Sequence, residues 1–150
     1  MKKDAKFYIE KYKMVPLPEG GHFCPVSRGE FIIPKELLGD DYSGEREAVS
    51  LIYYLLKKDE ISKWHLLKQE EYWLWHAGGV LELKIAETEE LKNEKTYLLD
   101  PNSGDFIARV PAGYWQTARV IEGDFVLVSC VVSPGYHDDE LFFLDGGIDG

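Results

Sequence analysis

The residues with the clearest chemical potential lie together in an eighteen-residue stretch, 62–79, which reads SKWHLLKQEEYWLWHAGG. The stretch contains two of the four histidines, two adjacent glutamates and three of the four tryptophans. Imidazole and carboxylate groups exchange protons or bind metal ions, and large aromatic side chains line pockets. Residues of these types gather where a segment forms a core, a site, or both.

The faces of the strands decide which of these side chains meet. Side chains alternate across a strand, so Glu71, Trp73 and Trp75 share one face of the same predicted strand. His65 on the preceding strand can face the same cavity, and Gln116 on a later strand adds an amide. The sequence therefore predicts a pocket with aromatic walls, one imidazole and one carboxylate.

His65 and Glu71 are the candidate catalytic residues. In the predicted pocket Glu71 would orient His65 and raise its basicity, which makes the imidazole a general base near neutral pH. The alternative is a structural role, in which His65 is hydrogen-bonded to Glu71 within a polar network that fixes the core. The residue types alone leave both alternatives open.

Candidate ligand-binding residues surround this pair. Walls formed by Trp73, Trp75 and either Tyr53 or Tyr54 would suit the apolar face of a sugar ring, although core filling explains the tryptophans equally well. Arg28 could hold a phosphate, a carboxylate or a nucleotide on that sugar, and a surface salt bridge is its alternative role. The predicted partner is therefore a small molecule of the sugar-derivative class.

The elements that must position these residues are mostly short strands. A short amphipathic helix is predicted over residues 5–13, one helical turn at PKELLG, and a second short helix from Asp138 to Leu144 before a frayed tail. Turns are predicted at the double glycine 78–79 and, as a hairpin, at 122–124. The predicted strands span residues 48–56, 61–67, 71–77, 81–86, 96–99, 106–110, 116–121 and 125–132.

About eight short strands with little helix predict an all-β fold, as an antiparallel double-sheet barrel or sandwich. The 150 residues, of which 45% are hydrophobic, suit one domain. Within the domain 1–150 we expect an N-terminal helix over 1–14, the barrel over 15–137, and a short C-terminal helix with a tail over 138–150.

The net charge and the distribution of apolar residues limit the expected partners and cellular location. The formal net charge of −10 opposes binding to nucleic acid and to anionic membrane surfaces, so neither is an expected partner. The N-terminal segment lacks the apolar region of a signal peptide, and no run is apolar for long enough to cross a membrane, so we expect a cytoplasmic protein. Cys24 and Cys130 are expected to be reduced, with Cys130 as a buried, inert thiol.

The pattern around the candidate site resembles the cupin superfamily. The first cupin motif has two histidines separated by one residue, followed by a glutamate and a glycine. His65, Glu71 and Gly78 stand at the positions of the first histidine, the glutamate and the glycine, whereas Leu67 stands where the second histidine would be. The resemblance implies a cupin-type double-stranded β-helix, or jelly-roll barrel, with short flanking helices.

The second cupin motif, PxG followed by a histidine, matches at Pro111 and Gly113 but has Gln116 at the histidine position. The chain resembles most closely the small single-domain cupins of unassigned function, through the strings PEGG, VPAGYWQ and SPGY. It departs from that group at Leu17, where the group usually has a histidine.

The resemblance implies three functional alternatives. Cupin epimerases and isomerases move a proton next to a carbonyl, so the enzymatic hypothesis is a sugar or nucleotide-sugar epimerase or isomerase with a histidine base. The second alternative is a non-catalytic metabolite-binding module. The third is a metal-dependent enzyme, because cupins commonly bind a divalent metal through three histidines and a glutamate. That ligand set is incomplete here, and the weak candidates are His65, Glu71, His76 and Gln116.

Cupins usually pair through their strands, which implies a homodimer. The apolar run 48–56, together with Tyr72 and Leu74 on the outward face of their strand, would be buried in that dimer.

Overall fold

The computed structural model describes residues 2–144, so the predicted tail 145–150 lies outside the described residues. The elements in chain order are α1 Ala5–Tyr12, β1 Val15–Pro16, β2 His22–Arg28, β3 Ile32–Ile33, α2 Lys35–Leu38, β4 Arg46–Glu47, β5 Ser50–Lys57, β6 Ile61–Leu67, β7 Glu70–Ala86, β8 Lys95–Leu99, β9 Ile107–Val110, β10 Trp115–Ser133, a 3₁₀ turn Asp138–Glu140 and β11 Leu141–Phe143. No helix among the described residues is long and apolar enough to cross a membrane.

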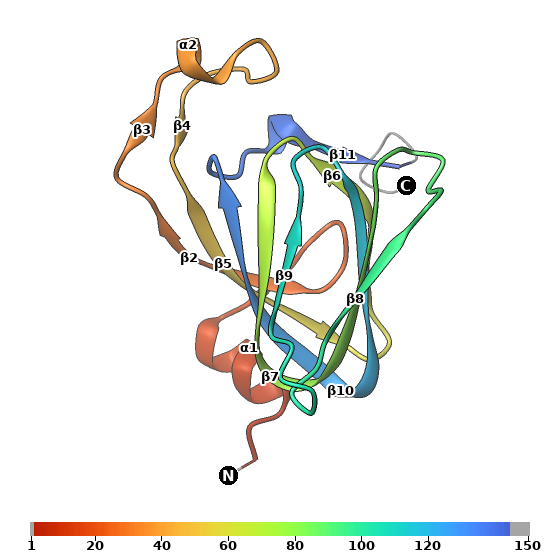
Figure 1. Ribbon diagram of the computed structural model, residues 1–150. Helices are drawn as coiled ribbons and strands as arrows, with labels where there is room; N and C mark the ends of the chain where they lie inside the picture. The colour runs from red at the N-terminus through yellow and green to blue at the C-terminus, as the bar shows by residue number, and fades with distance from the viewer. Residues whose placement is uncertain (1, 145–150) are drawn as a thin grey trace.

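Two long strands, β7 and β10, organise a nine-stranded antiparallel sheet (Figure 1). The first part of β10 pairs with β6, its second part pairs with β5, and β7 runs beside it along both parts. β8 and β9 pair with the two ends of β7, while β2 and β11 extend the sheet beside β5 and β6. Because both long strands bend, the sheet closes on itself as a jelly-roll barrel, which confirms the predicted all-β cupin fold.

The two long strands correct the predicted turns. Residues 71–77 and 81–86 belong to one strand, β7, and residues 116–121 and 125–132 belong to one strand, β10. Register shifts near Glu122 mark the bend where the two strands cross from one layer to the other. A Cβ on Gly79 would lie 1.8 Å from the backbone oxygen of Glu122, and one on Gly78 would lie 2.1 Å from that of Phe125. The glycine pair therefore permits a close approach of two backbones and does not form a turn.

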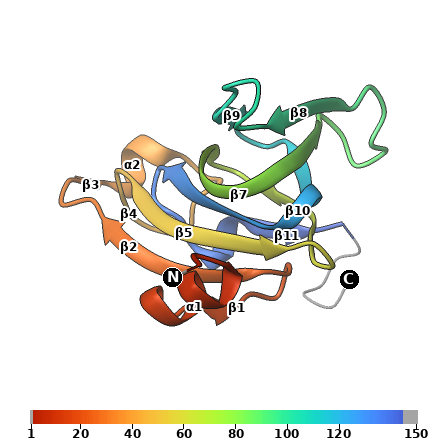
Figure 2. The same cartoon turned by 90° about the horizontal axis from the view of Figure 1, so that it is seen from below.

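The helix α1 covers the outer face of β5. Asp4 caps it, because its carboxylate accepts a hydrogen bond of 2.9 Å from the backbone nitrogen of Phe7. Tyr12 stacks on Tyr53 at 4.4 Å between ring centroids, and Leu55 is fully buried in the cluster beneath the helix. Seen from below, α1 lies on the side of the barrel away from β8 and β9 (Figure 2). The helix therefore covers Tyr53 and Leu55 within one chain, whereas Val49 of the same run stays exposed, and the homodimer remains a prediction.

Residues 29–47 form an arm that projects from the barrel and carries β3, α2 and β4 (Figure 1). The helical turn predicted at PKELLG is confirmed as α2. Large apolar side chains are exposed on the arm, with Phe31 at 82% and Leu37 at 77%. The arm is tied to the barrel by Arg46, whose guanidinium donates to both carboxylate oxygens of buried Glu140 at 2.8 Å.

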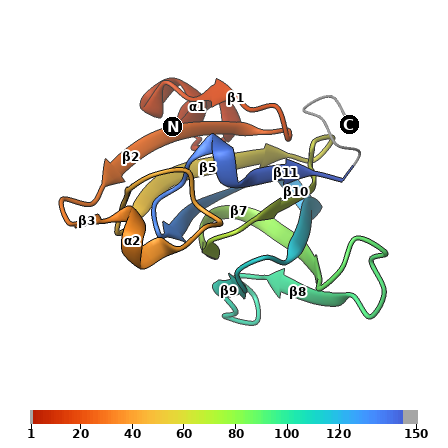
Figure 3. The same ribbon diagram turned by 90° about the horizontal axis from the view of Figure 1, so that it is seen from above.

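The C-terminal segment differs from the predicted helix 138–144. Only Asp138–Glu140 forms a 3₁₀ turn, and Leu141–Phe143 pairs with β6 as β11. The sheet therefore continues beyond the predicted barrel boundary at residue 137. The turn and β11 lie at the upper end of the barrel in Figure 1, which Figure 3 shows from above.

Candidate functional site

A cavity of about 660 Å³ opens into the barrel, which is a size typical of small-molecule sites. Its walls come from the loop after β1, from strands β2, β5, β6, β7 and β10, and from the segment after β10. Most of the lining is apolar. The lining residues are Leu17, Pro18, Glu19, Phe23, Pro25, Ser27, Arg28, Ser50, Leu51, Ile52, His65, Leu67, Glu71, Cys130, Val132, Tyr136, Asp138, Leu141, Phe142 and Phe143.

Glu71 reaches the cavity from β7, where its side chain is only 7% exposed. Its Oε1 accepts a hydrogen bond of 2.9 Å from Nε2 of Gln116. Burial raises the pKa of Glu71 to about 7, and the nearby carboxylate of Glu19 acts in the same direction, while the bond from Gln116 opposes the shift. Glu71 is therefore a buried acid poised to exchange a proton at neutral pH.

His65 reaches the same cavity from β6 and is 4% exposed. Its Nδ1 lies 2.6 Å from the backbone oxygen of Lys63. A carbonyl oxygen can only accept, so Nδ1 carries the proton and Nε2 of the neutral ring is a hydrogen-bond acceptor. Burial lowers the pKa of His65 to about 4, so the imidazole is neutral at pH 7.

The predicted hydrogen bond between His65 and Glu71 is not formed. Both line the cavity, but His65 is oriented by Lys63 and Glu71 by Gln116, and the described residues contain no hydrogen bond between them. Desolvation acts on both groups without a compensating charge, so it shifts the two pKa values in opposite directions. The group that titrates near neutral pH is Glu71, and the predicted base His65 is not.

Trp73 and Gln116 form the support behind Glu71. Trp73 is 2% exposed and its Nε1 donates to Oε1 of Gln116 at 3.0 Å. Both ends of the buried amide are thus in use, one toward the indole and one toward the carboxylate. These two residues hold Glu71 in place, but neither lines the cavity, so the predicted ligand contact through Trp73 and Gln116 is not formed.

Trp75 and Tyr53 also lie away from the cavity. Trp75 stacks on Phe106 at 5.6 Å between ring centroids, and four residues of strand carry it about 13 Å from Glu71. Tyr53 lies under α1 on the outer face of β5, where it stacks on Tyr12. The predicted tryptophan and tyrosine walls are therefore wrong, and the aromatic side chains that do line the cavity are Phe23, Tyr136, Phe142 and Phe143.

Arg28 lies at the cavity, yet its charge is already neutralised. Its Nη1 is 2.8 Å from Oε1 of Glu47, and its Nη2 donates to the backbone oxygen of Tyr136 at 2.7 Å. The salt bridge that the sequence left as the alternative is confirmed. Arg28 thus braces the end of β2 against the segment after β10.

Three acidic or phenolic groups were missed from the sequence. Glu19, Tyr136 and Asp138 line the cavity together with Glu71. Burial raises the pKa of Glu19, and the charge of Asp138 raises it further. The hydroxyl of Tyr136 donates to Oδ1 of Asp138 at 2.6 Å, and burial raises the pKa of that phenol well above its usual range. Glu19 lies in the string PEGG and Tyr136 in the string SPGY. Both strings are far from Glu71 in the sequence, and only the folding of the chain brings them to the site.

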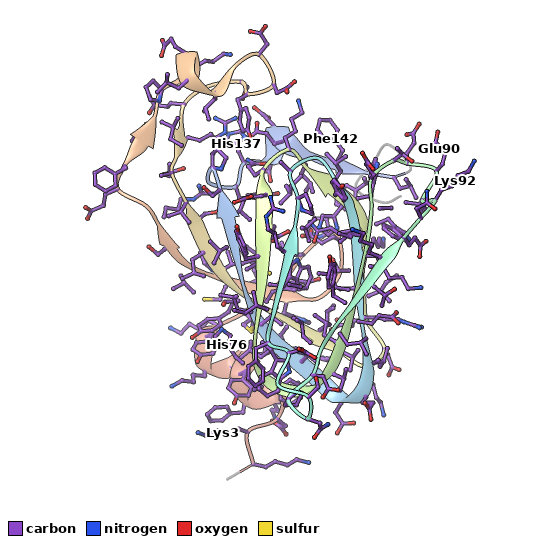
Figure 4. The ribbon with its side chains drawn as sticks, in the orientation of Figure 1. Lys3, His76, Glu90, Lys92, His137 and Phe142 are labelled. Carbon is purple, nitrogen blue, oxygen red and sulfur yellow. The ribbon has the colours of Figure 1, made fainter. Side chains whose placement is uncertain are left out.

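The predicted metal ligands do not converge. Leu67 and Leu17, which stand where histidines would be expected, line the cavity as apolar groups. Gln116 is committed on both sides, and His76 lies near α1 at the opposite end of the barrel from His137, with its Nε2 2.9 Å from Oγ of Ser129 (Figure 4). Residues 2–144 therefore do not bring together the three histidines and the glutamate of the cupin metal set.

Within residues 2–144 the possible metal-ligating atoms of three side chains lie within 4.8 Å of one another. These side chains are His137, Asp139 and Glu140. The carboxylate of Glu140 is already bound by Arg46. The group is thus an ion-pair network at the base of the arm, outside the cavity lining.

The geometry agrees with a family assignment. A family model described as Cupin superfamily (DUF985) matches residues 6–144. The chain belongs to the cupin superfamily. No protein with a curated description matches it.

Several solved structures superpose on this cupin. A hypothetical protein from Leishmania major superposes with a TM-score of 0.79 at 27% identity, covering 93% of this chain and 86% of that one. A protein from Shewanella oneidensis superposes with a TM-score of 0.78 at 29% identity, covering 95% and 85%. The capsular polysaccharide assembling protein CapF from Staphylococcus aureus gives 0.61 at 12% identity, with 87% of this chain and 31% of that one covered, which is a likeness of fold alone.

Proposed function

We propose that this cupin binds a small organic molecule in the barrel cavity and that Glu71 exchanges a proton with it, as in a carbohydrate isomerase or epimerase. The observation that carries the proposal is a buried carboxyl group with a pKa of about 7 on the wall of a 660 Å³ cavity. A general acid–base group is most effective when its pKa lies near the working pH.

The surroundings of Glu71 suit a proton shift between two neighbouring carbons. The carboxylate takes a proton from the carbon next to the carbonyl, which leaves an enediolate. The hydroxyl proton then passes from one of the two neighbouring oxygens to the other, with Nε2 of His65 as its relay, and the protonated carboxyl returns its own proton to the neighbouring carbon. Nε2 of His65 can accept a hydrogen bond from a hydroxyl group and so position the ligand. Phe23 and Phe143 offer apolar surface to the ring or chain of the ligand.

Isomerisation is the better supported of the two reactions. An epimerase needs a second proton donor on the far face of the carbon, and the phenol of Tyr136 is committed to Asp138. A 1,2-isomerisation needs one group that takes and returns the carbon-bound proton on the same face, which Glu71 can supply. It also needs transfer of the hydroxyl proton between the two oxygens, for which Nε2 of His65 lies in the same cavity. A nucleotide on the sugar is less suited to this cavity, because Arg28 already binds Glu47.

The second candidate is a non-catalytic metabolite-binding module. It is favoured by the same commitment of Tyr136, because Glu71 then lacks a phenolic proton donor, while Nε2 of His65 still offers the ligand a fixed hydrogen-bond acceptor. Such a module would show ligand binding without any exchange of ligand protons with solvent.

Solvent exchange separates the two candidates. Neutral and amine-bearing aldoses and ketoses are incubated with the protein in deuterated water, and proton NMR follows loss of the signal at the carbon next to the carbonyl. The isomerase proposal predicts exchange that is lost in Glu71→Gln and kept in Glu122→Gln, a control at an exposed position with the same change in charge. Sugars that raise the melting temperature but exchange no faster than in buffer would assign the binding module, and no binding at all contradicts both.

A further inference from the structure

Four side chains of the cavity lining, Glu19, His65, Glu71 and Asp138, offer hydrogen-bond acceptors to a ligand. We propose that the ligand of this cavity is an organic cation, such as an amine-bearing sugar or a comparable small ammonium compound. This inference rests on the proposed binding function, because it names the chemical class of the molecule bound in the same cavity.

The acceptors come from four separate elements. Glu19 extends from the loop after β1, Glu71 from β7, His65 from β6, and Asp138 from the 3₁₀ turn at the exposed rim. The bond to Lys63 fixes the proton of His65 on Nδ1, so the nitrogen left for the ligand is an acceptor. A ligand that satisfies these groups must bring hydrogen-bond donors.

Positive charge in the cavity lining is limited to one side chain, and that side chain is occupied. Arg28 is the one lysine or arginine among the lining residues, and its two terminal nitrogens bind Glu47 and the backbone of Tyr136. A phosphate or carboxylate entering the cavity would meet Glu19 and Asp138 without a free cation to balance its charge. Like charges repel, so an anionic ligand is disfavoured.

The spacing of the acceptors favours an organic cation over a metal ion. Among residues 2–144, three ligating atoms come within 4.8 Å of one another at His137, Asp139 and Glu140, and not at the cavity acceptors. A metal ion needs its donors to converge at about 2 Å, whereas an organic cation can spread its donors over its own length. Leu67 and Phe143 supply the apolar wall that the carbon skeleton of such a ligand would contact.

Three probes of the same ring size test the charge preference: cyclohexylammonium, cyclohexanol and cyclohexanecarboxylate at millimolar concentration. Thermal shift and calorimetry should show the ammonium compound binding most tightly and the carboxylate least. At neutral pH the bound cation should also release protons from the partly protonated Glu71, so the heat of binding should change with the ionisation heat of the buffer.

Two variants link the preference to the named carboxylates. Glu19→Gln and Asp138→Asn should each weaken binding of the ammonium probe about tenfold, since each removes a nearby negative charge. Glu122→Gln, which changes the net charge equally at an exposed site, should leave the affinity unchanged. Using two variants keeps the test valid if one of them folds poorly.

The outcomes distinguish this inference from the proposed function. Binding of cyclohexanol or the carboxylate as tightly as the ammonium compound overturns the inference but leaves a ligand-binding cavity. Equal affinity for the ammonium probe in both variants and the control also overturns it. If none of the three probes binds, the proposed binding function fails, and this inference fails with it.

Discussion

Replacing Glu71 by Gln and His65 by Asn should change the pH dependence of stability in opposite directions. The folded pKa of Glu71 is raised from 4.5 to about 7, so the stability that its protonated form provides is present below pH 4.5 and is lost as the pH rises to 7. The folded pKa of His65 is lowered from 6.5 to about 4, so stability is lost as the pH falls from 6.5 toward 4.

The size of each effect follows from the shift. Each group changes by about 2.5 pKa units, which corresponds to about 3 kcal/mol of unfolding free energy. Both side chains are almost fully buried, so screening by solvent reduces these values little. In the wild-type protein the contributions of Glu71 and His65 to the unfolding free energy change in opposite directions between pH 4.5 and 6.5. Each variant removes one contribution, so the pH dependence that remains is that of the other residue.

The assay is urea unfolding at a series of pH values from 4 to 8, analysed as the difference between each variant and the wild type. Relative to wild type, Glu71→Gln should gain about 3 kcal/mol as the pH rises from 4.5 to 7, and His65→Asn should gain about the same as the pH falls from 6.5 to 4. Gln and Asn keep the hydrogen bonds to Gln116 and Lys63, so the pH-independent cost stays small. Glu122→Gln serves as the control for net charge.

Difference curves without slope would refute this account of the two residues. An ion pair between His65 and Glu71 would lower the pKa of the carboxyl and raise that of the imidazole, so both difference curves would slope the other way. The sign of the slopes therefore separates two independently desolvated groups from the hydrogen-bonded pair that the sequence suggests.

Gly79→Ala should destabilise the protein by about 1–3 kcal/mol in urea unfolding, because its Cβ would overlap a backbone oxygen of β10. Gly44→Ala, whose Cβ would make only an ordinary contact, should cost less than about 1 kcal/mol. Equal costs would contradict the close approach of β7 and β10 at Gly79. Arg46→Gln should lower the free energy of unfolding by about 3–5 kcal/mol, because it leaves the buried carboxylate of Glu140 unpaired. Arg28→Gln should lower it by no more than about 1 kcal/mol, because the salt bridge to Glu47 is exposed. The reverse order would be inconsistent with the burial of the two pairs. Light scattering should show a homodimer that weakens in Phe31→Ser, since Phe31 is largely exposed on the arm; a monomeric mass at micromolar concentration would end that prediction.

Local patterning in the sequence predicts much of the fold. Alternation in 81–86 and the apolar runs 48–56 and 125–132 identify strands that the structure confirms. The predicted turns at Gly78 and Gly123 fail because glycine serves equally for a reversal and for a bend beneath a crossing backbone. Only the partner strand, which is distant in sequence, decides between these two uses.

The site is only partly predictable for a related reason. Alternation correctly placed Glu71 and Trp73 on the inner face, and pairing of β6 with β10 brings His65 beside Gln116. That reasoning ignored position along the strand, because four residues of rise place Trp75 about 13 Å from Glu71, where it stacks on Phe106. The contribution of Glu19 depends on loop contacts that no local pattern encodes.

The measurement that tests the central claim most directly is the titration of the Glu71 carboxyl carbon by ¹³C NMR, with Glu71→Gln used to assign its signal. The account predicts a midpoint near pH 7, and it predicts that this midpoint moves to lower pH when cyclohexylammonium is added. A midpoint near 4.5, unchanged by the ammonium compound, would mean that Glu71 is an ordinary solvated carboxylate and would contradict its role as the proton-exchanging group of this cavity.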